Sequence, residues 1–267
     1  MEHEMLDLLD LERFPIDRPE SDACIDLVET CREALARDGM FNLDGFVRAE
    51  AIARAAEELT PLTDSLSFHQ SRAHNVYFLK SIPGVPDDHP ALAKAVTSSH
   101  TLCDDQMPDS IIHAIYEWQP LADFLARVME KPRLYLMDDP LARANVMSYR
   151  DGEGLGWHFD RSEFTTTLLI QSPEAGGEFQ YRTDLRSDDD PNLDGVARLL
   201  SGQDPEQKTL RLHPGTLNIF KGKNTLHGVS PAQGDRNRLI AVFSYYERPG
   251  VMFNDDERLG FYGRTVA

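Results

Sequence analysis

The segment Gly156-Trp157-His158-Phe159-Asp160 holds the side chains best suited to chemistry. In an extended strand, residues two apart point to the same face, so His158 and Asp160 project together. His227 follows 67 residues after Asp160 and is the candidate for a third ligand. Two imidazoles and one carboxylate on one face of an octahedron leave three coordination positions open. These residue types predict a metal site at His158, Asp160 and His227.

A buried arginine is expected near the same site. Arg238 stands eleven residues after His227 and opens the apolar run Leu239-Ile240-Ala241-Val242-Phe243. An arginine at the start of a buried strand is costly unless an anion pairs with it. A guanidinium fork matches the planar geometry of a ligand carboxylate. We favour Arg238 for this role, and Arg236 on the same side is the alternative.

Composition limits the classes of partner. The chain has 267 residues, 45 acidic against 27 basic, and a formal net charge of -18. Such a field repels phosphate backbones and anionic membranes, so neither nucleic acid nor a membrane is an expected partner. It agrees with a cationic substrate, although solubility alone explains it equally well.

The expected location is the cytoplasm. Cys24, Cys31 and Cys103 form an odd set without close metal-binding spacing, which is typical of a reducing compartment. The acidic N-terminus lacks the basic-then-apolar pattern of a secretion signal. No apolar run approaches the roughly 20 residues needed to cross a bilayer.

The first half of the chain has mainly helical patterns. Apolar residues at helical spacing and turn residues at the ends predict helices over 21–37, 48–59 and 109–130, the last broken near Pro120. Short strands are expected over 40–43 and 74–80.

After Pro140 the pattern changes to short apolar or alternating runs separated by turn residues. Such runs predict a β sandwich or barrel. We expect one domain over residues 1–267: largely helical support over 1–140, a β core over 141–250, and a tail or lid over 251–267. An acidic insert over 184–207 is expected to carry a short helix, Val196–Leu200. The strands are expected over 143–149, 155–159, 164–171, 177–182, 209–213, 216–220, 224–229 and 238–247.

Several motifs resemble the iron(II)/2-oxoglutarate dioxygenase superfamily in the right order. They are Tyr149-Arg150-Asp151-Gly152 before His158-Phe159-Asp160, then Gly176-Gly177-Glu178-Phe179, Pro214-Gly215-Thr216-Leu217, and His227 with Pro231, Gly234 and Arg236. The resemblance implies a double-stranded β-helix (jelly roll), an α+β fold with a mainly β core and packed N-terminal helices. It also implies iron(II), 2-oxoglutarate and O2 as cofactors. Decarboxylation of 2-oxoglutarate by O2 would release CO2 and succinate and leave a ferryl-oxo species, which would abstract a hydrogen atom from an aliphatic C–H and transfer hydroxyl to the resulting carbon radical.

A closer resemblance is to carrier-free amino-acid oxygenases, which include radical halogenases of lysine and related amino acids and their hydroxylating relatives. It is carried by Ala144-Asn145-Val146-Met147, Gly156-Trp157-His158, Thr167-Leu168-Leu169, Gly177-Glu178-Phe179 and Phe243-Ser244-Tyr245. In the halogenases a glycine stands where the carboxylate ligand would be, which opens a position for chloride. Here that position is Asp160. The resemblance therefore implies the hydroxylase branch and disfavours halogenation.

A free amino acid, with lysine or another basic one as the leading substrate, would need counterparts for its charges. Arg72 and His74 are candidates for its carboxylate, and Arg72 is equally a surface residue. Asp138 and Asp139 are candidates for its ammonium, although acidic pairs before proline more often form turns. Asn145 and Tyr149 share strand parity and are candidates to line the cofactor pocket, with packing as the alternative.

Two other functions fit the same residues. One is hydroxylation of a protein side chain or peptidyl proline, which needs an open groove. The other is a non-catalytic, metal-binding jelly roll of cupin type. Manganese and cobalt bind the same ligand set as iron. The sequence leaves the oligomeric state open.

Overall fold

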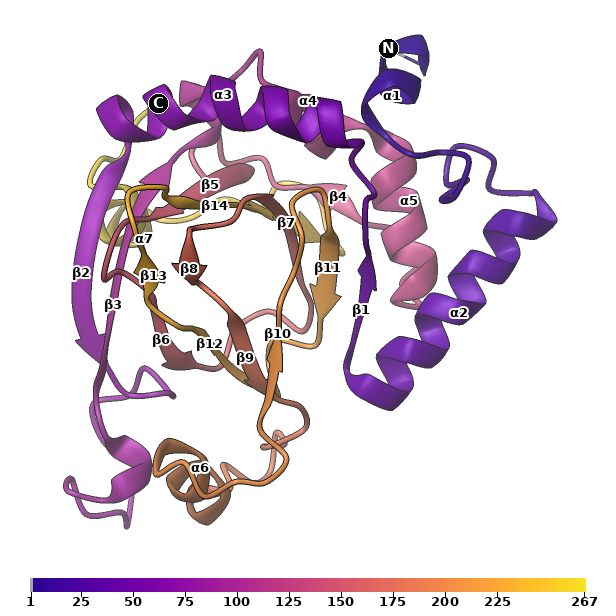
Figure 1. Ribbon diagram of the computed structural model, residues 1–267. Helices are drawn as coiled ribbons and strands as arrows, with labels where there is room; N and C mark the ends of the chain where they lie inside the picture. Colours follow the sequence, from indigo (N-terminus) through magenta and orange to yellow (C-terminus); the bar gives the residue numbers. More distant parts are fainter. Residues whose placement is uncertain (1) are drawn as a thin grey trace.

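Two antiparallel sheets face each other in the computed structural model, which describes residues 2–267, with side chains from Met5 onward (Figure 1). The larger sheet has the strand order β1-β11-β7-β14-β5-β3-β2, and the smaller one β10-β9-β12-β6. In the larger sheet the strands are β1 (Met40–Leu43), β2 (Phe68–His74), β3 (Ala95–Leu102), β5 (Ala144–Tyr149), β7 (Thr165–Gln171), β11 (Leu217–Phe220) and β14 (Arg238–Phe243). In the smaller sheet they are β6 (Leu155–His158), β9 (Phe179–Arg182), β10 (Lys208–Leu210) and β12 (Leu226–Val229).

Two short strand pairs and the helices complete the fold. The pairs join β13 (Ala232–Gln233) to β8 (Ala175–Gly176), and β15 (Tyr245–Tyr246) to β4 (Tyr135–Leu136). The helices are α1 (Glu2–Leu8), α2 (Asp22–Asp38), α3 (Ala49–Leu66), α4 (Ile111–Glu117), α5 (Gln119–Val128), α6 (Leu193–Leu200) and α7 (Asp255–Tyr262), with 3-10 turns η1 (Pro90–Leu92) and η2 (Asp104–Gln106). A mainly β core with packed helices confirms the predicted fold class.

The helices cover the outer face of the larger sheet. Figure 1 shows α3 and α4 crossing one side of it, while α2 and α5 lie together beside β1. The side chains of β14 alternate between the two faces of the larger sheet. Leu239 and Ala241 point outward into the helix-covered core, and Arg238 and Ile240 point inward between the sheets. The space between the two sheets is therefore where polar chemistry can be placed.

Local signals explain the boundaries of α2. The Ser21 side chain accepts a hydrogen bond from the backbone N–H of Cys24 and caps the first turn. Gly39 ends the helix with a φ of 72°, a left-handed conformation that glycine adopts without steric cost. The predicted helix over 21–37 and strand over 40–43 are confirmed.

Other expected elements differ from the structure. Residues 74–80 do not form a strand: β2 ends at His74, and the segment after it is a turn in which Phe78 has a φ of 55°. The strand β3, for which no element was expected, joins β2 to the larger sheet. Helix α3 continues past the expected end at residue 59 and contains Pro61. The expected break near Pro120 is confirmed, because Trp118 separates α4 from α5. Among the helices of residues 2–267, none has the length and apolar character that crossing a bilayer requires.

Candidate metal centre

His158, Asp160 and His227 come together between the sheets. Their ligand atoms all lie within 4.8 Å of one another. The Nε2 atom of His158 is 3.2 Å from Asp160 Oδ1, and that of His227 is 3.5 Å from Asp160 Oδ2. The two histidines are cross-strand partners on β6 and β12, and their ring centroids are 4.2 Å apart. Antiparallel pairing thus brings together two residues that are far apart in the sequence.

The other nitrogen of each imidazole is held by the backbone. His158 Nδ1 lies 2.9 Å from the Gly156 carbonyl oxygen, and His227 Nδ1 lies 3.0 Å from that of Thr225. A carbonyl oxygen accepts a hydrogen bond from Nδ1–H and so fixes the tautomer in which Nε2 is unprotonated. Both Nε2 lone pairs are therefore directed toward the Asp160 carboxylate, as metal coordination requires.

Asp160 is positioned by close neighbours. Its backbone N–H donates to the Gly222 carbonyl oxygen at 3.1 Å, and the Thr165 hydroxyl donates to Oδ2. A Cβ atom added to Gly222 would stand 2.2 Å from Asp160 Oδ2. Only glycine at position 222 therefore leaves room for the carboxylate in this orientation.

Electrostatics favour a divalent cation at these three residues. Burial raises the pKa of Asp160, but the His227 and His158 rings and the Thr165 hydroxyl outweigh it, and the pKa lies below its usual range. Burial lowers the pKa of His227 to about 4 despite the opposing effect of Asp160. At neutral pH the carboxylate is ionised and His227 is neutral. Both are in the protonation state that binds a metal.

Arg238 and Arg236 differ in burial. Arg238 is 2% exposed, and its Nε donates to the Gly177 carbonyl oxygen at 3.0 Å while its Nη1 has no partner within the described chain. Arg236 is exposed and donates to the carbonyl oxygens of Ser172 and Pro173 at 2.8 and 3.3 Å. An unpaired buried guanidinium nitrogen is costly unless a ligand satisfies it. The structure thus favours Arg238 as the carboxylate-binding residue.

A cavity of about 250 Å³ adjoins Arg238. Phe179 lines this cavity, and its ring centroid is 5.7 Å from that of His227. The ring of Tyr149 lies 5.6 Å from the Arg238 guanidinium carbon. Burial lowers the pKa of Arg238, as expected of a cation without an anionic neighbour. Donor set, unpaired cation and cavity together fit a metal with a dicarboxylate ligand.

A family model described as Halogenase D matches residues 25–252. The chain belongs to this family. No curated protein sequence matches it significantly.

Solved structures share the fold of this Halogenase D family member. One is the epimerase SnoN from nogalamycin biosynthesis, described as non-haem and α-ketoglutarate-dependent, with 14% identity, 83% of each chain covered and a TM-score of 0.55. Another is HygX from Streptomyces hygroscopicus, solved with nickel, 2-oxoglutarate and hygromycin B, with 14% identity, 81% of this chain and 86% of that chain covered, and a TM-score of 0.53. A Pseudomonas putida prolyl-4-hydroxylase has 14% identity, 83% and 100% coverage, and a TM-score of 0.50. At these identities the similarity establishes the jelly-roll fold.

In this Halogenase D family member, one of the two residues expected to bind a substrate carboxylate, His74, lies beside the candidate ligand His158, and the other, Arg72, is exposed. The ring of His74 is 6.4 Å from that of His158, and its Nε2 is 2.7 Å from the Thr97 hydroxyl oxygen. Arg72 lies between two aromatic rings, 5.4 Å from the centroid of Phe78 and 5.5 Å from that of Phe261. The Phe78 ring is in turn 5.8 Å from that of His158. Sequence reasoning missed Phe78, whose place depends on a left-handed backbone turn.

Asp139 and Asn145 have structural partners. Asp139 is 0% exposed; its Oδ2 accepts from Arg258 Nε at 2.9 Å and its Oδ1 from the Leu141 N–H at 2.9 Å. Asn145 Nδ2 donates to the Leu141 carbonyl oxygen at 2.6 Å, and its Oδ1 accepts from the Tyr262 hydroxyl at 2.9 Å. Both residues therefore fasten α7 to the core. The neighbouring Asp138 is exposed.

Two segments border the metal centre. Helix α7 contacts Arg72 through Phe261, and its Glu257 accepts a hydrogen bond from Arg161, the residue after Asp160. The acidic insert reaches the metal centre from another direction, because the Tyr77 hydroxyl donates to the Pro191 carbonyl oxygen at 2.7 Å and the Tyr77 ring stacks on Phe159 at 5.7 Å. The segments expected to act as rim and lid thus both contact residues next to the ligands.

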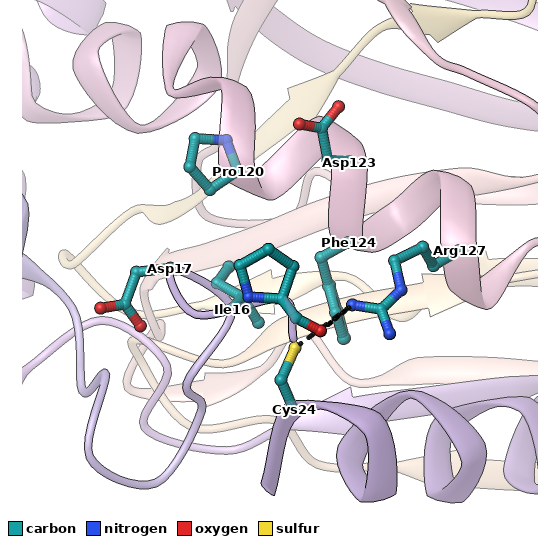
Figure 2. Close-up of a pocket in the computed structure, with 8 residues that line it drawn as sticks. Ile16, Asp17, Cys24, Pro120, Asp123, Phe124 and Arg127 are labelled. Atoms are coloured by element: carbon teal, nitrogen blue, oxygen red, sulfur yellow. Dashed lines mark hydrogen bonds between the residues drawn. The ribbon is translucent and has the colours of Figure 1, made fainter. Parts of the chain in front are cut away.

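A second cavity, of about 190 Å³, lies between the N-terminal loop and α5 (Figure 2). Arg127 faces it, and its Nη1 donates to the Pro19 carbonyl oxygen at 2.8 Å and to Cys24 Sγ at 3.6 Å. None of His158, Asp160 and His227 lines this cavity, so it is no part of the metal centre.

Proposed function

We propose that this protein is an iron(II)- and 2-oxoglutarate-dependent hydroxylase of an unactivated C–H bond in a free amino acid. The observation that carries the proposal is the convergence of His158, Asp160 and His227 into a set with two imidazoles and one carboxylate. Iron(II) with 2-oxoglutarate and O2 supplies the oxidising power for such a reaction.

The side chains of this chain have separate tasks in the proposal. The three ligands leave the remaining coordination positions on one side for the cosubstrates. Arg238 binds the distal carboxylate of 2-oxoglutarate through the guanidinium atoms that have no protein partner. The aromatic rings of Phe179 and Phe220 lie beside His227, and that of Tyr149 lies beside Arg238. They exclude water from the proposed 2-oxoglutarate site and strengthen the ionic contact to Arg238.

Hydroxylation is favoured over halogenation because a carboxylate stands at position 160. Its two oxygens face both histidines, so it occupies the coordination position that a halide would need. The description of the matching family, Halogenase D, makes chloride-dependent chlorination the second candidate.

A small, basic amino acid is the favoured substrate, with lysine the leading candidate. Helix α7 and the acidic insert both contact residues beside the metal ligands, which favours a small substrate over a protein chain in an open groove. We assign the substrate carboxylate to Arg72 and His74, because the His74 ring lies beside that of His158 and Arg72 lies over Phe78, which also neighbours His158. The net charge of -18 favours a cationic molecule and disfavours nucleic acid. We assign no ammonium contact to Asp139, because Arg258 already pairs with it.

Incubation with pooled free amino acids, with and without chloride, distinguishes hydroxylation from chlorination. The protein is incubated with iron(II), 2-oxoglutarate and the pool, with and without chloride, and products are identified by mass spectrometry. The expected product is a basic amino acid that has gained one oxygen atom, independent of chloride. A product with a chlorine isotope pattern would establish the second candidate instead. Absence of any product while a peptide library is hydroxylated would overturn the substrate assignment, and His227→Ala is the inactive control.

A further inference from the structure

A second cluster of metal-ligating side chains lies near one edge of the larger sheet. His69 on β2 and His100 on β3 are cross-strand partners, and their rings stack with centroids 4.5 Å apart. Glu153, in the turn between β5 and β6, completes the cluster, and the ligand atoms of all three lie within 4.8 Å of one another. Three separate elements thus bring two imidazoles and a carboxylate together.

The distances in this cluster fit a metal ion better than a hydrogen bond. Glu153 Oε1 is 3.3 Å from His69 Nε2 and 3.4 Å from His100 Nε2. Charge-assisted hydrogen bonds are shorter, roughly 2.7–2.9 Å. The edge of a tetrahedron around zinc, worked from bond lengths near 2.1 Å, is roughly 3.3–3.5 Å. The measured separations match that edge.

The Glu153 carboxylate is held in place by further contacts. Its Oε2 accepts from the backbone N–H of Arg150 at 2.9 Å, and its Oε1 accepts from the Ser98 hydroxyl at 2.9 Å. Ser98 Oγ is also 3.2 Å from His69 Nε2, so it marks the side on which a fourth ligand, such as water, would bind.

The cluster is separate from the candidate iron centre. On β2 and β3, His74 and Thr97 point toward His158, and the two strands pair without a register shift. His69 lies five residues before His74 and His100 three after Thr97, so alternation places both on the opposite face of the sheet. An ion bound here would not share a ligand with the iron centre.

We propose that His69, His100 and Glu153 form a second metal site for a divalent cation of the zinc class. Two histidines and one carboxylate with an exposed fourth position are ligands that zinc accepts in tetrahedral geometry. A bound ion would tie β2 and β3 to the turn that leads into β6, the strand that carries His158. The proposal does not depend on the reaction catalysed at the other site.

Zinc titration of the purified protein tests the site by stoichiometry. The wild type is expected to bind two equivalents, and His69→Ala one. Because His69 is half exposed, its replacement is compatible with folding, which circular dichroism of the metal-free protein checks. Loss of one of three protein ligands is expected to weaken zinc at this site by about 100-fold or more. Cobalt(II) added in place of zinc should give the intense visible absorption of a tetrahedral ion in the wild type but not in the variant.

Three further variants make the outcome decisive. Glu153→Gln keeps the volume of the side chain and should lose the same equivalent, even if the alanine variant proves unstable. His213→Ala, at an exposed histidine paired with Asp44, should keep both equivalents. Asp160→Asn should lose the other equivalent and retain the cobalt(II) spectrum. A Glu153→Gln variant that binds as many zinc equivalents as the wild type, or an Asp160→Asn variant that binds none while the wild type binds one, overturns the proposal.

Discussion

Replacing Arg238 with methionine separates a ligand-binding arginine from a structural one. The side chain is 2% exposed, and its one hydrogen bond within the described residues runs from Nε to the Gly177 carbonyl oxygen. If its remaining nitrogens bind 2-oxoglutarate, the variant loses charge-assisted hydrogen bonds worth roughly 1.5–3 kcal/mol each. A loss of about 3 kcal/mol corresponds to a Kd for 2-oxoglutarate raised roughly 150-fold.

The same substitution should not weaken the free protein. Replacing a buried ion without a partner by an apolar side chain of similar volume is neutral or stabilising by about 1–4 kcal/mol. The Gly177 carbonyl oxygen left without its donor costs about 1 kcal/mol in return. The free energy of unfolding without cofactor is therefore expected to stay the same or rise, although affinity falls.

Two measurements test the expected loss of 2-oxoglutarate affinity and the expected unchanged or higher stability. Anaerobic titration calorimetry with manganese(II) in place of iron gives the Kd for 2-oxoglutarate, and thermal melts give the stability of the cofactor-free protein. Arg236→Met is the matched control, because Arg236 is exposed and donates only to backbone carbonyl oxygens. The reasoning fails if Arg238→Met leaves the Kd unchanged and lowers the melting temperature, or if Arg236→Met carries the loss of affinity.

Three other substitutions have defined outcomes. Gly222→Ala should displace Asp160, because the new Cβ would lie 2.2 Å from Oδ2, and the affinity for iron in a chelator competition should fall roughly 10–100-fold. The control Gly260→Ala, with open space around it, should leave the affinity unchanged. Equal affinities of the two variants would contradict the conclusion that Gly222 leaves room for the Asp160 carboxylate. Asp160→Gly removes the carboxylate ligand and opens its position, so the hydroxylated product should disappear from mass spectra and a chlorinated one appear when chloride is added; persistent hydroxylation would argue against Asp160 as a ligand. Arg258→Met strands the fully buried Asp139 carboxylate and should cost about 3 kcal/mol in urea unfolding; a change under about 0.5 kcal/mol would mean that this pair behaves like an exposed one.

The metal ligands were accessible to sequence reasoning because their geometry is mostly local. His158 and Asp160 are two residues apart, which keeps them close, although β6 ends at His158 and the strand alternation used to pair them does not extend to Asp160. The burial of Arg238 follows from the apolar run after it. Choosing between Arg238 and Arg236 needed the structure, because both stand at odd distances from His227 and burial alone separates them.

The strands β2 and β3 were harder to predict. The β2 segment Phe-His-Gln-Ser-Arg-Ala-His has little apolar alternation and is mostly exposed. Its extended form depends on pairing with β3, which in turn pairs with β5 some 45 residues further along the chain. Residues 74–80 have a strand-like composition, yet Val76 and Tyr77 pack against the insert instead of entering a sheet. Whether β2 and residues 74–80 form strands depends on residues that are distant in the sequence, and a local sequence pattern carries no information about those partners.

Closing the metal centre requires β6 to end at His158. In a continuing strand, Asp160 would lie about 6.6 Å along from His158. Instead the backbone leaves the sheet: the Phe159 N–H donates to the Val76 carbonyl oxygen and the Asp160 N–H to that of Gly222, each at 3.1 Å. This turn brings the carboxylate to 3.2 Å from His158 Nε2. The segment after β2, which sequence reasoning placed in a strand, thus supplies the acceptor that ends β6, and the irregular backbone at both segments is what allows three residues to surround one ion.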